Sequence, residues 1–417
     1  MKILIEKKNL SSRLMCFLVS NYYLFAMAMY LYVLKKSEFR VGVYSGIVML
    51  VIAVLYILKY GIRSKLYGIE IYVFMYLIIS LASCINYLPE KVSIVVFFQT
   101  VVNSLFPLVF FACGSNGIFF SKKSFLIGFD ICCIFGIYLL FTKPSWYFLF
   151  CIERGYSFTR LSACFGSTAV GTLSCVAIVY SLELIKNSKS VIYKIQYLMS
   201  CVFCLLSMQR SAWIAGLLSI IVLHYWLLKV GSINTYHILI EIVCIISVCF
   251  FAREYVIGVF ERWVLEHNVS GSKIYEIFSR STQWKAALKE SDWIIGSGLG
   301  LRGHRSISVG VADGDWIRIL CEIGILGVIL LLFIVCRSMV ISKYDKERCI
   351  GPLLIIICYA LQAIGSNVFE YQILAPAFWM SVGEISFAYS TKFIEMEKIR
   401  NENNCTISTS ISQDTRE

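Results

Sequence analysis

The stretch "DWIRILCEIGILGVILLLF", residues 315–333, begins with charged side chains and continues as an unbroken apolar run. Arg318 lies four residues before Glu322, and the next charged residue after Glu322 is Arg337. An apolar run of this length matches a helix that crosses the hydrocarbon core of a bilayer. The stretch therefore predicts a membrane helix over residues 317–336 with a polar start.

Apolar blocks of this kind recur along the whole chain. The 417 residues are 59% apolar and 15% charged, with a mean hydropathy of +0.75, which leaves too little charge for the surface of a soluble protein. We expect about twelve spanning helices, at roughly 14–34, 41–58, 69–88, 92–113, 124–142, 161–182, 191–208, 211–228, 236–252, 317–336, 350–368 and 372–390. The predicted fold class is all-α, a polytopic integral membrane protein.

One expected connection is much longer than the others. Residues 1–252 hold the first nine predicted helices, and residues 253–316 form a long extracytoplasmic loop. Residues 317–390 hold the last three helices, and residues 391–417 form a polar cytoplasmic tail.

Basic residues predict the orientation, because Lys and Arg concentrate on the cytoplasmic side of short loops. With both termini cytoplasmic, most basic residues of the short loops fall inside, although Lys35, Lys36 and Arg40 do not. The formal charge of +12 then reflects topology and one basic outer loop, so we expect no nucleic-acid partner.

The 17 cysteines lie almost entirely inside predicted helices, where cysteine is a small apolar residue, so we expect no disulfide framework.

The end of the long loop carries two motifs in "IIGSGLGLRGHRSISVGVADGDW", residues 294–316. Gly298-x-Gly300-x-x-Gly303 has the spacing of a dinucleotide-binding turn, but that site needs a soluble βαβ unit, which is missing from this sequence context. Asp313-Gly-Asp315 resembles a metal-binding carboxylate pair and lies on the same outer face, away from nucleotide donors. We expect neither cofactor nor metal, and assign the glycines to tight turns or close backbone approach.

The outer loops also gather arginines that could bind a diphosphate, namely Arg160, Arg210, Arg280, Arg305 and Arg318. The guanidinium group is permanently charged and donates hydrogen bonds in a planar fork that suits phosphate oxygens. Any one arginine at a membrane boundary can instead place its charge in water while its stem stays in lipid. The cluster favours anion binding more than any single member does.

His304 is the first candidate for a catalytic base. Its neighbours Arg302 and Arg305 favour the neutral ring, the form that accepts a proton. Asp315, with Asp313 beside it, is the second candidate. The alternative is that His304 is a solvated loop residue.

Residues 270–291, "SGSKIYEIFSRSTQWKAALKES", place apolar side chains at near-helical spacing among lysines and arginines. They predict an amphipathic helix at the outer membrane boundary, which could bind substrate or simply cover the surface.

These features together resemble the superfamily of bacterial O-antigen polymerases and O-antigen ligases. "SRSTQWKAALKESDWIIGSGLG" resembles the family's Arg…Trp…Ala segment and its glycine turn, and the stretch from residue 315 resembles its Glu-x-Gly-x-x-Gly helix. "RLSACFGSTAVGT" (160–172) and "SMQRSAW" (207–213) resemble two further family segments. Many members carry His-Asn where this chain has Asp313-Gly-Asp315, so the identity of the base stays open.

The resemblance implies a GT-C-like, metal-independent, inverting glycosyltransferase of the bacterial inner membrane. Its donor and acceptor are oligosaccharides on undecaprenyl diphosphate, it lies among membrane lipids, and a chain-length regulator is an implied partner. The diphosphate arginines stabilise the leaving group, and a base accepts the proton of the attacking hydroxyl. A polymerase is the first interpretation, a ligase that transfers polymer to lipid A–core is the second, and a lipid-linked oligosaccharide flippase is the third.

Overall fold

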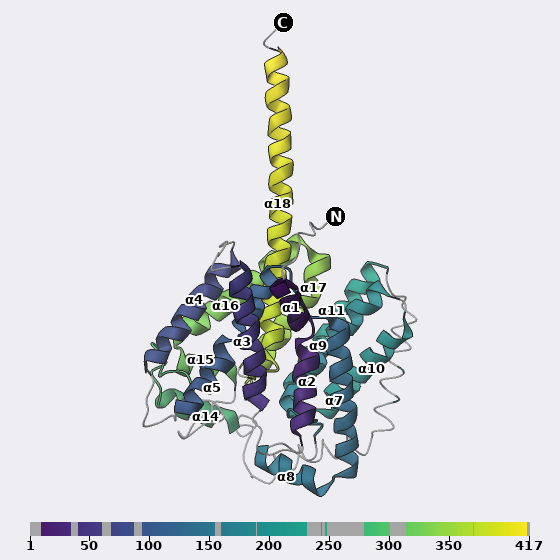
Figure 1. Cartoon of the computed structure of the whole chain (residues 1–417), viewed down its shortest axis with the longest axis vertical. Coiled ribbons are helices and arrows are strands. Elements are labelled where there is room, and N and C mark those ends of the chain that lie inside the picture. The colour runs from purple at the N-terminus through teal and green to yellow at the C-terminus, as the bar shows by residue number, and fades with distance from the viewer. Residues whose placement is uncertain are drawn as a thin grey trace.

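The computed structural model describes residues 10–34, 41–60, 68–86, 94–154, 160–188, 190–231, 243, 247, 279–300, 314–369 and 371–414. Within these ranges every regular element is a helix, which confirms the all-α prediction. The helices pack side by side into a bundle, from which one long helix projects (Figure 1). The ninth predicted span, 236–252, lies almost wholly outside the described residues.

The described helices follow the order of the predicted spans. They are α1 (Leu10–Ser20), α2 (Tyr22–Val33), α3 (Val41–Tyr60), α4 (Ile69–Ser83), η1 (Cys84–Asn86), α5 (Ile94–Leu105), α6 (Leu108–Ser115), α7 (Lys122–Thr142), α8 (Ser145–Arg154), α9 (Ser167–Asn187), α10 (Val191–Leu206), α11 (Arg210–Lys229), α14 (Ser279–Lys289), α15 (Asp315–Glu322), α16 (Ile325–Ile341), η3 (Ser342–Tyr344), α17 (Lys346–Gln362) and α18 (Ala375–Asp414).

Several of these helices have the length and composition of membrane spans. In the described part of the chain, four meet both requirements: Lys122–Thr142, Ser167–Asn187, Arg210–Lys229 and Ile325–Tyr344. A fifth span is possible if α1 and α2, which meet at an angle of 60°, are counted together. Other apolar helices, such as Ile69–Ser83 and Val191–Leu206, are shorter. The length and composition of these helices are compatible with a membrane protein.

Three predicted spans are interrupted rather than continuous. The span at 14–34 bends between α1 and α2, and the span at 92–113 breaks before Pro107, whose nitrogen cannot donate a helical hydrogen bond. The span at 317–336 is divided into α15 and α16 at Gly324, which has a φ of 89°. Polar α15 is therefore a separate short helix, and the apolar helix α16 begins only at Ile325.

Helix α9 forms the centre of the bundle and packs against α7, α10, α11 and α17. Small residues allow other helices to approach closely, as between α6 and α18. A Cβ atom on Gly114 would lie 2.9 Å from the carbonyl oxygen of Met380, and one on Gly383 would lie 2.5 Å from that of Phe111. Close backbone contact at small residues is typical of helix pairs in membranes.

The outer surface of the bundle is apolar along whole helix faces. On α7, Ile127, Ile131, Ile134 and Tyr138 are 50%, 51%, 51% and 58% exposed. Their spacing of three and four residues places them on one face of the helix. A long exposed apolar face of this kind suits contact with lipid rather than water.

The two ends of the bundle differ. The start of α1 and the projecting part of α18 lie at one end, which we call the α18 end (Figure 1). Lys122, the first residue of α7, pairs there with Glu183 near the end of α9. The opposite end, which we call the loop end, holds α8, α14 and the turns that follow α10 and α17.

Candidate functional site

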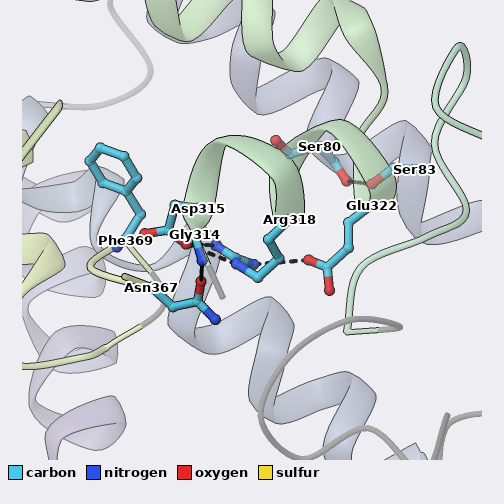
Figure 2. Close-up of polar contacts among 8 residues, drawn as sticks. All are labelled: Ser80, Ser83, Gly314, Asp315, Arg318, Glu322, Asn367 and Phe369. Atoms are coloured by element: carbon cyan, nitrogen blue, oxygen red, sulfur yellow. Dashed lines mark hydrogen bonds and ion pairs between the residues drawn. The ribbon is translucent and has the colours of Figure 1, made fainter. Parts of the chain in front are cut away.

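Helix α15 carries a buried set of three charged side chains, Asp315, Arg318 and Glu322 (Figure 2). Arg318 Nε donates to Asp315 Oδ1 at 2.9 Å, and its Nη2 lies 2.8 Å from the same oxygen. Arg318 Nη1 donates to Glu322 Oε2 at 2.8 Å. Spacings of three and four residues place the three groups on one helix face. We call them the α15 triad.

The loop between α17 and α18 fixes the start of α15. Asn367 Oδ1 accepts a hydrogen bond from the N–H of Gly314 at 2.9 Å, and Asp315 Oδ2 accepts one from the N–H of Phe369 (Figure 2). Gly314 has a φ of 120° and a Cβ there would lie 2.7 Å from the carbonyl oxygen of Ile364, so only glycine fits. The backbone conformation between the two aspartates therefore requires glycine at position 314.

This geometry changes the roles expected of two residues. Both oxygens of Asp315 are already acceptors, and the residue is fully buried, so a substrate hydroxyl would have to displace existing bonds to reach it. Arg318 lies between two carboxylates, and the formal charges of the triad sum to −1, which opposes the approach of a diphosphate. The arrangement favours a positioning role for Asp315 and Arg318 over the base and anion-binding roles expected from sequence.

The glycine motif forms a tight turn that contacts the junction of α15 and α16. Gly296, Gly298 and Gly300 all have positive φ, at 93°, 100° and 86°. The N–H of Gly298 donates to the carbonyl of Glu322 at 3.0 Å, and a Cβ on Gly296 would lie 2.6 Å from that same oxygen. These glycines serve close backbone contact, as the sequence predicted. Gly303 lies outside the described residues.

Two of the predicted anion-binding arginines occupy neighbouring turns. Arg160 precedes α9, and Arg210 is the first residue of α11; both side chains are exposed. The N–H of Leu161 donates to the carbonyl of Leu206 at 2.9 Å, so the two turns are joined through their backbones at the loop end. We call this pair of turns the arginine turns.

The other predicted site residues cannot be placed. Arg280 is the second residue of α14, but its side chain is outside the described part of the structure. His304, Arg305 and Asp313 fall within residues 301–313, which are also outside it. Their roles stay predictions.

A chain of polar contacts links the arginine turns to the α15 triad. Gln209 Nε2, next to Arg210, donates to Ser366 Oγ at 2.9 Å. The carbonyl of Ser366 accepts from the N–H of Asp315 at 3.3 Å, and Asn367 follows directly. Sequence reasoning missed Gln209, Ser366 and Asn367, because polar residues between two spans look like ordinary loop residues. The sequence feature that could have identified them is the stretch "QAIGSNVFEYQ", residues 362–372, which is rich in amide side chains for a short turn.

The predicted helix in the long loop is confirmed in part as α14, Ser279–Lys289. Its Ala287 is buried against Cys321 of α15, with Leu288 and Ile317 packed around them. Lys285 and Lys289 are exposed on the other side. The apolar side of α14 therefore packs against α15, next to the triad.

A second charged cluster lies at the α18 end. Lys122 Nζ is 2.7 Å from Glu183 Oε2, and the Arg348 guanidinium lies over the rings of Phe119 and Phe387, at 5.3 and 4.8 Å. Its charges join α7, α9, α17 and α18, so we assign it to holding helices together. Among the described residues, no group of three His, Cys, Asp or Glu side chains could hold a metal ion.

Comparison of the sequence with models of known protein families and with curated proteins finds no match.

Proposed function

We propose that this protein is a membrane glycosyltransferase that joins oligosaccharide repeat units carried on undecaprenyl diphosphate, as an O-antigen polymerase does. The observation that carries the proposal is the meeting of two predicted segments at the loop end. The turn that bears Arg210 and the start of α15 are joined through Gln209, Ser366 and Asn367. These are the segments whose sequences resemble the polymerase and ligase superfamily.

In the proposed reaction, a hydroxyl of the acceptor sugar attacks the anomeric carbon of the donor. The new carbon–oxygen bond forms as the bond to the diphosphate breaks, and the lipid diphosphate leaves with the bonding electrons. The hydroxyl proton passes to a base. Because negative charge grows on the leaving group, nearby cations lower the barrier.

The proposal gives the residues distinct roles. Arg160 and Arg210 bind the diphosphate, because both are exposed on adjoining turns at the loop end. Arg280 and Arg305 are further candidates for this role, and His304 is the proposed base, with Asp313 as the alternative. The α15 triad holds the end of the long loop in place.

The proposed topology has about twelve spans in a GT-C-like arrangement. The loop end faces the outside of the bacterial inner membrane, and both termini are cytoplasmic. Lys122 and Lys123 at the start of α7, and Lys343 and Lys346 around the start of α17, support this orientation, because they gather toward the α18 end.

A deletion of the gene, followed by gel analysis of lipopolysaccharide, tests the function. A polymerase mutant keeps core with a single repeat unit. A ligase mutant shows bare core with polymer left on the lipid carrier. A flippase mutant shows bare core with single units retained inside. The flippase is the candidate favoured by Asp130, a buried carboxylate within α7 that accepts from Gln196 Nε2 at 2.9 Å.

The arginine turns are tested by Arg210→Ala and Arg160→Ala in the complemented deletion strain. We expect loss of the polymer ladder at normal protein levels. The matched control is Lys229→Ala, because Lys229 is an exposed cation at the other end of the same helix as Arg210. An intact ladder in both arginine variants would remove the diphosphate assignment. His304→Ala with full activity would exclude His304 as the base.

A further inference from the structure

An apolar groove runs between α7 and α10 on the surface of the bundle. It has a volume of about 300 Å³, is open to the surface, and is lined by Ile134, Ile137, Ile195, Leu198, Met199, Val202 and Phe203. We propose that this groove binds the isoprenoid chain of the lipid diphosphate, with the diphosphate at the arginine turns. The inference rests on the proposed function, because that function supplies the lipid carrier.

The first argument is continuity between the groove and the arginine turns. Phe203 lies one helical turn before the end of α10 at Leu206, and the carbonyl of Leu206 binds the Leu161 N–H beside Arg160. Arg210 follows four residues after Leu206. A chain in the groove therefore reaches exposed cations where it leaves the bundle, which matches a ligand with an apolar tail and an anionic head.

The second argument is the length and closure of the groove. From Ile195 to Phe203, α10 rises by about 12 Å, so the groove accommodates part of a long chain rather than a compact ligand. On α7, Asp130 lies one turn before Ile134, toward the α18 end, and its Oδ2 accepts a hydrogen bond from Gln196 Nε2 at 2.9 Å. The other oxygen of Asp130 is buried and has no partner in the described structure. The apolar path along α7 therefore stops at Asp130, because an isoprenoid cannot satisfy this carboxylate.

The third argument is that every residue lining the groove is apolar. Exposed apolar side chains such as Ile214, Leu217 and Ile221 also occur on α11. The lining of the groove comes from two helices, so a chain there is contacted on more than one side and buries more apolar surface per unit length than on a single helix face.

Photo-crosslinking of the full chain tests the site directly. The chain is placed in vesicles of phosphatidylethanolamine and phosphatidylglycerol with a polyprenyl diphosphate that bears a diazirine in its chain, and labelled peptides are mapped by mass spectrometry. We expect labels on α7 and on α10 between residues 195 and 203, removed by excess undecaprenyl diphosphate. Equal labelling of α11, or equal competition by phosphatidylglycerol, would mean that the groove holds bulk lipid and would overturn the proposal.

A groove-filling variant gives a second, independent measurement. Met199→Trp places a large ring in the groove, and the matched control Leu217→Trp places the same ring on α11, where Leu217 is 59% exposed. Excluding about 60 Å² of apolar contact weakens binding roughly tenfold. We expect this loss of probe labelling in Met199→Trp only. Unchanged labelling in a folded Met199→Trp protein contradicts the proposal.

The two proposals can fail separately. If the groove is labelled but deletion of the gene leaves the polymer ladder intact, the groove stands as a polyprenyl site and the proposed function fails. If the deletion leaves core with a single repeat unit but the groove is not labelled, the function stands and the groove assignment fails.

Discussion

Replacing Arg318 by methionine removes the central cation of the α15 triad while keeping a long side chain. The guanidinium makes contacts of 2.9 and 2.8 Å to Asp315 Oδ1 and of 2.8 Å to Glu322 Oε2. The side chains of Asp315 and Glu322 are 0% exposed, and that of Arg318 is 3% exposed. The substitution leaves two buried carboxylates, about two helical turns apart, without a cation.

Removing one partner of a buried ion pair lowers stability by about 3–5 kcal/mol, because the remaining charge is left without compensation. We expect a loss in this range for Arg318→Met. The measurement is thermal or denaturant unfolding of the purified full chain in detergent, followed by tryptophan fluorescence and checked by gel filtration. The control is Arg337→Met, since Arg337 is a half-buried arginine of α16 and its replacement should change stability by less than about 0.5 kcal/mol.

A triple variant, Asp315→Asn with Arg318→Met and Glu322→Gln, separates charge from packing. Neutralising a whole buried ion-pair network is often nearly neutral for stability, whereas breaking it is not. We therefore expect the triple variant to recover most of the stability lost in Arg318→Met. The reasoning is refuted if Arg318→Met is as stable as the wild type, or if the triple variant is no more stable than the single one.

Three further substitutions test the backbone around this site and the bundle. Gly314→Ala should lower the stability of the protein by about 1–3 kcal/mol, because the added Cβ would lie 2.7 Å from a carbonyl oxygen and φ is 120°. Gly216→Ala is its control in the same unfolding assay, since a Cβ there would have only ordinary contacts of 3.5 Å or more. Asn367→Ala leaves a buried N–H unpaired and should cost about 1–3 kcal/mol by the same measurement. Gly383→Val should force α18 away from α6 and abolish the monodisperse gel-filtration peak, and a normal peak would contradict the close contact between the two helices.

The helices could be predicted from sequence because apolar length is a local property. A run such as residues 122–142 must be buried or in lipid wherever it lies, so its identity as a helix does not depend on its neighbours. The breaks were not predictable in the same way. The bend between Ser20 and Tyr22 and the division at Gly324 depend on other segments, since Ser20 binds the N–H of Ser121 and Ile325 donates to Ile294.

The contacts of the candidate site between residues close in sequence could be predicted. Its contacts with residues far away in sequence could not. The spacing of Asp315, Arg318 and Glu322 was visible, and on a helix it places opposite charges in contact. The hydrogen bonds from Phe369 and to Asn367 join residues more than 50 positions apart, and no local pattern reports them. Without the bond from Phe369, Asp315 keeps one oxygen open to act as a base.

The contacts of the glycines fix the described residues on both sides of the segment that contains His304. On one side of residues 301–313, Gly298 donates to the carbonyl of Glu322, and Gly300 packs against Thr100 of α5. On the other side, Gly314 donates to Asn367. Both flanks of the segment that contains His304 are thus bound to the ends of the same short helix. These contacts join the start of α15 to the loop between α17 and α18, and the end of α15 to the glycine turn. The short helix is therefore fixed at both ends by segments that no local sequence pattern connects to it.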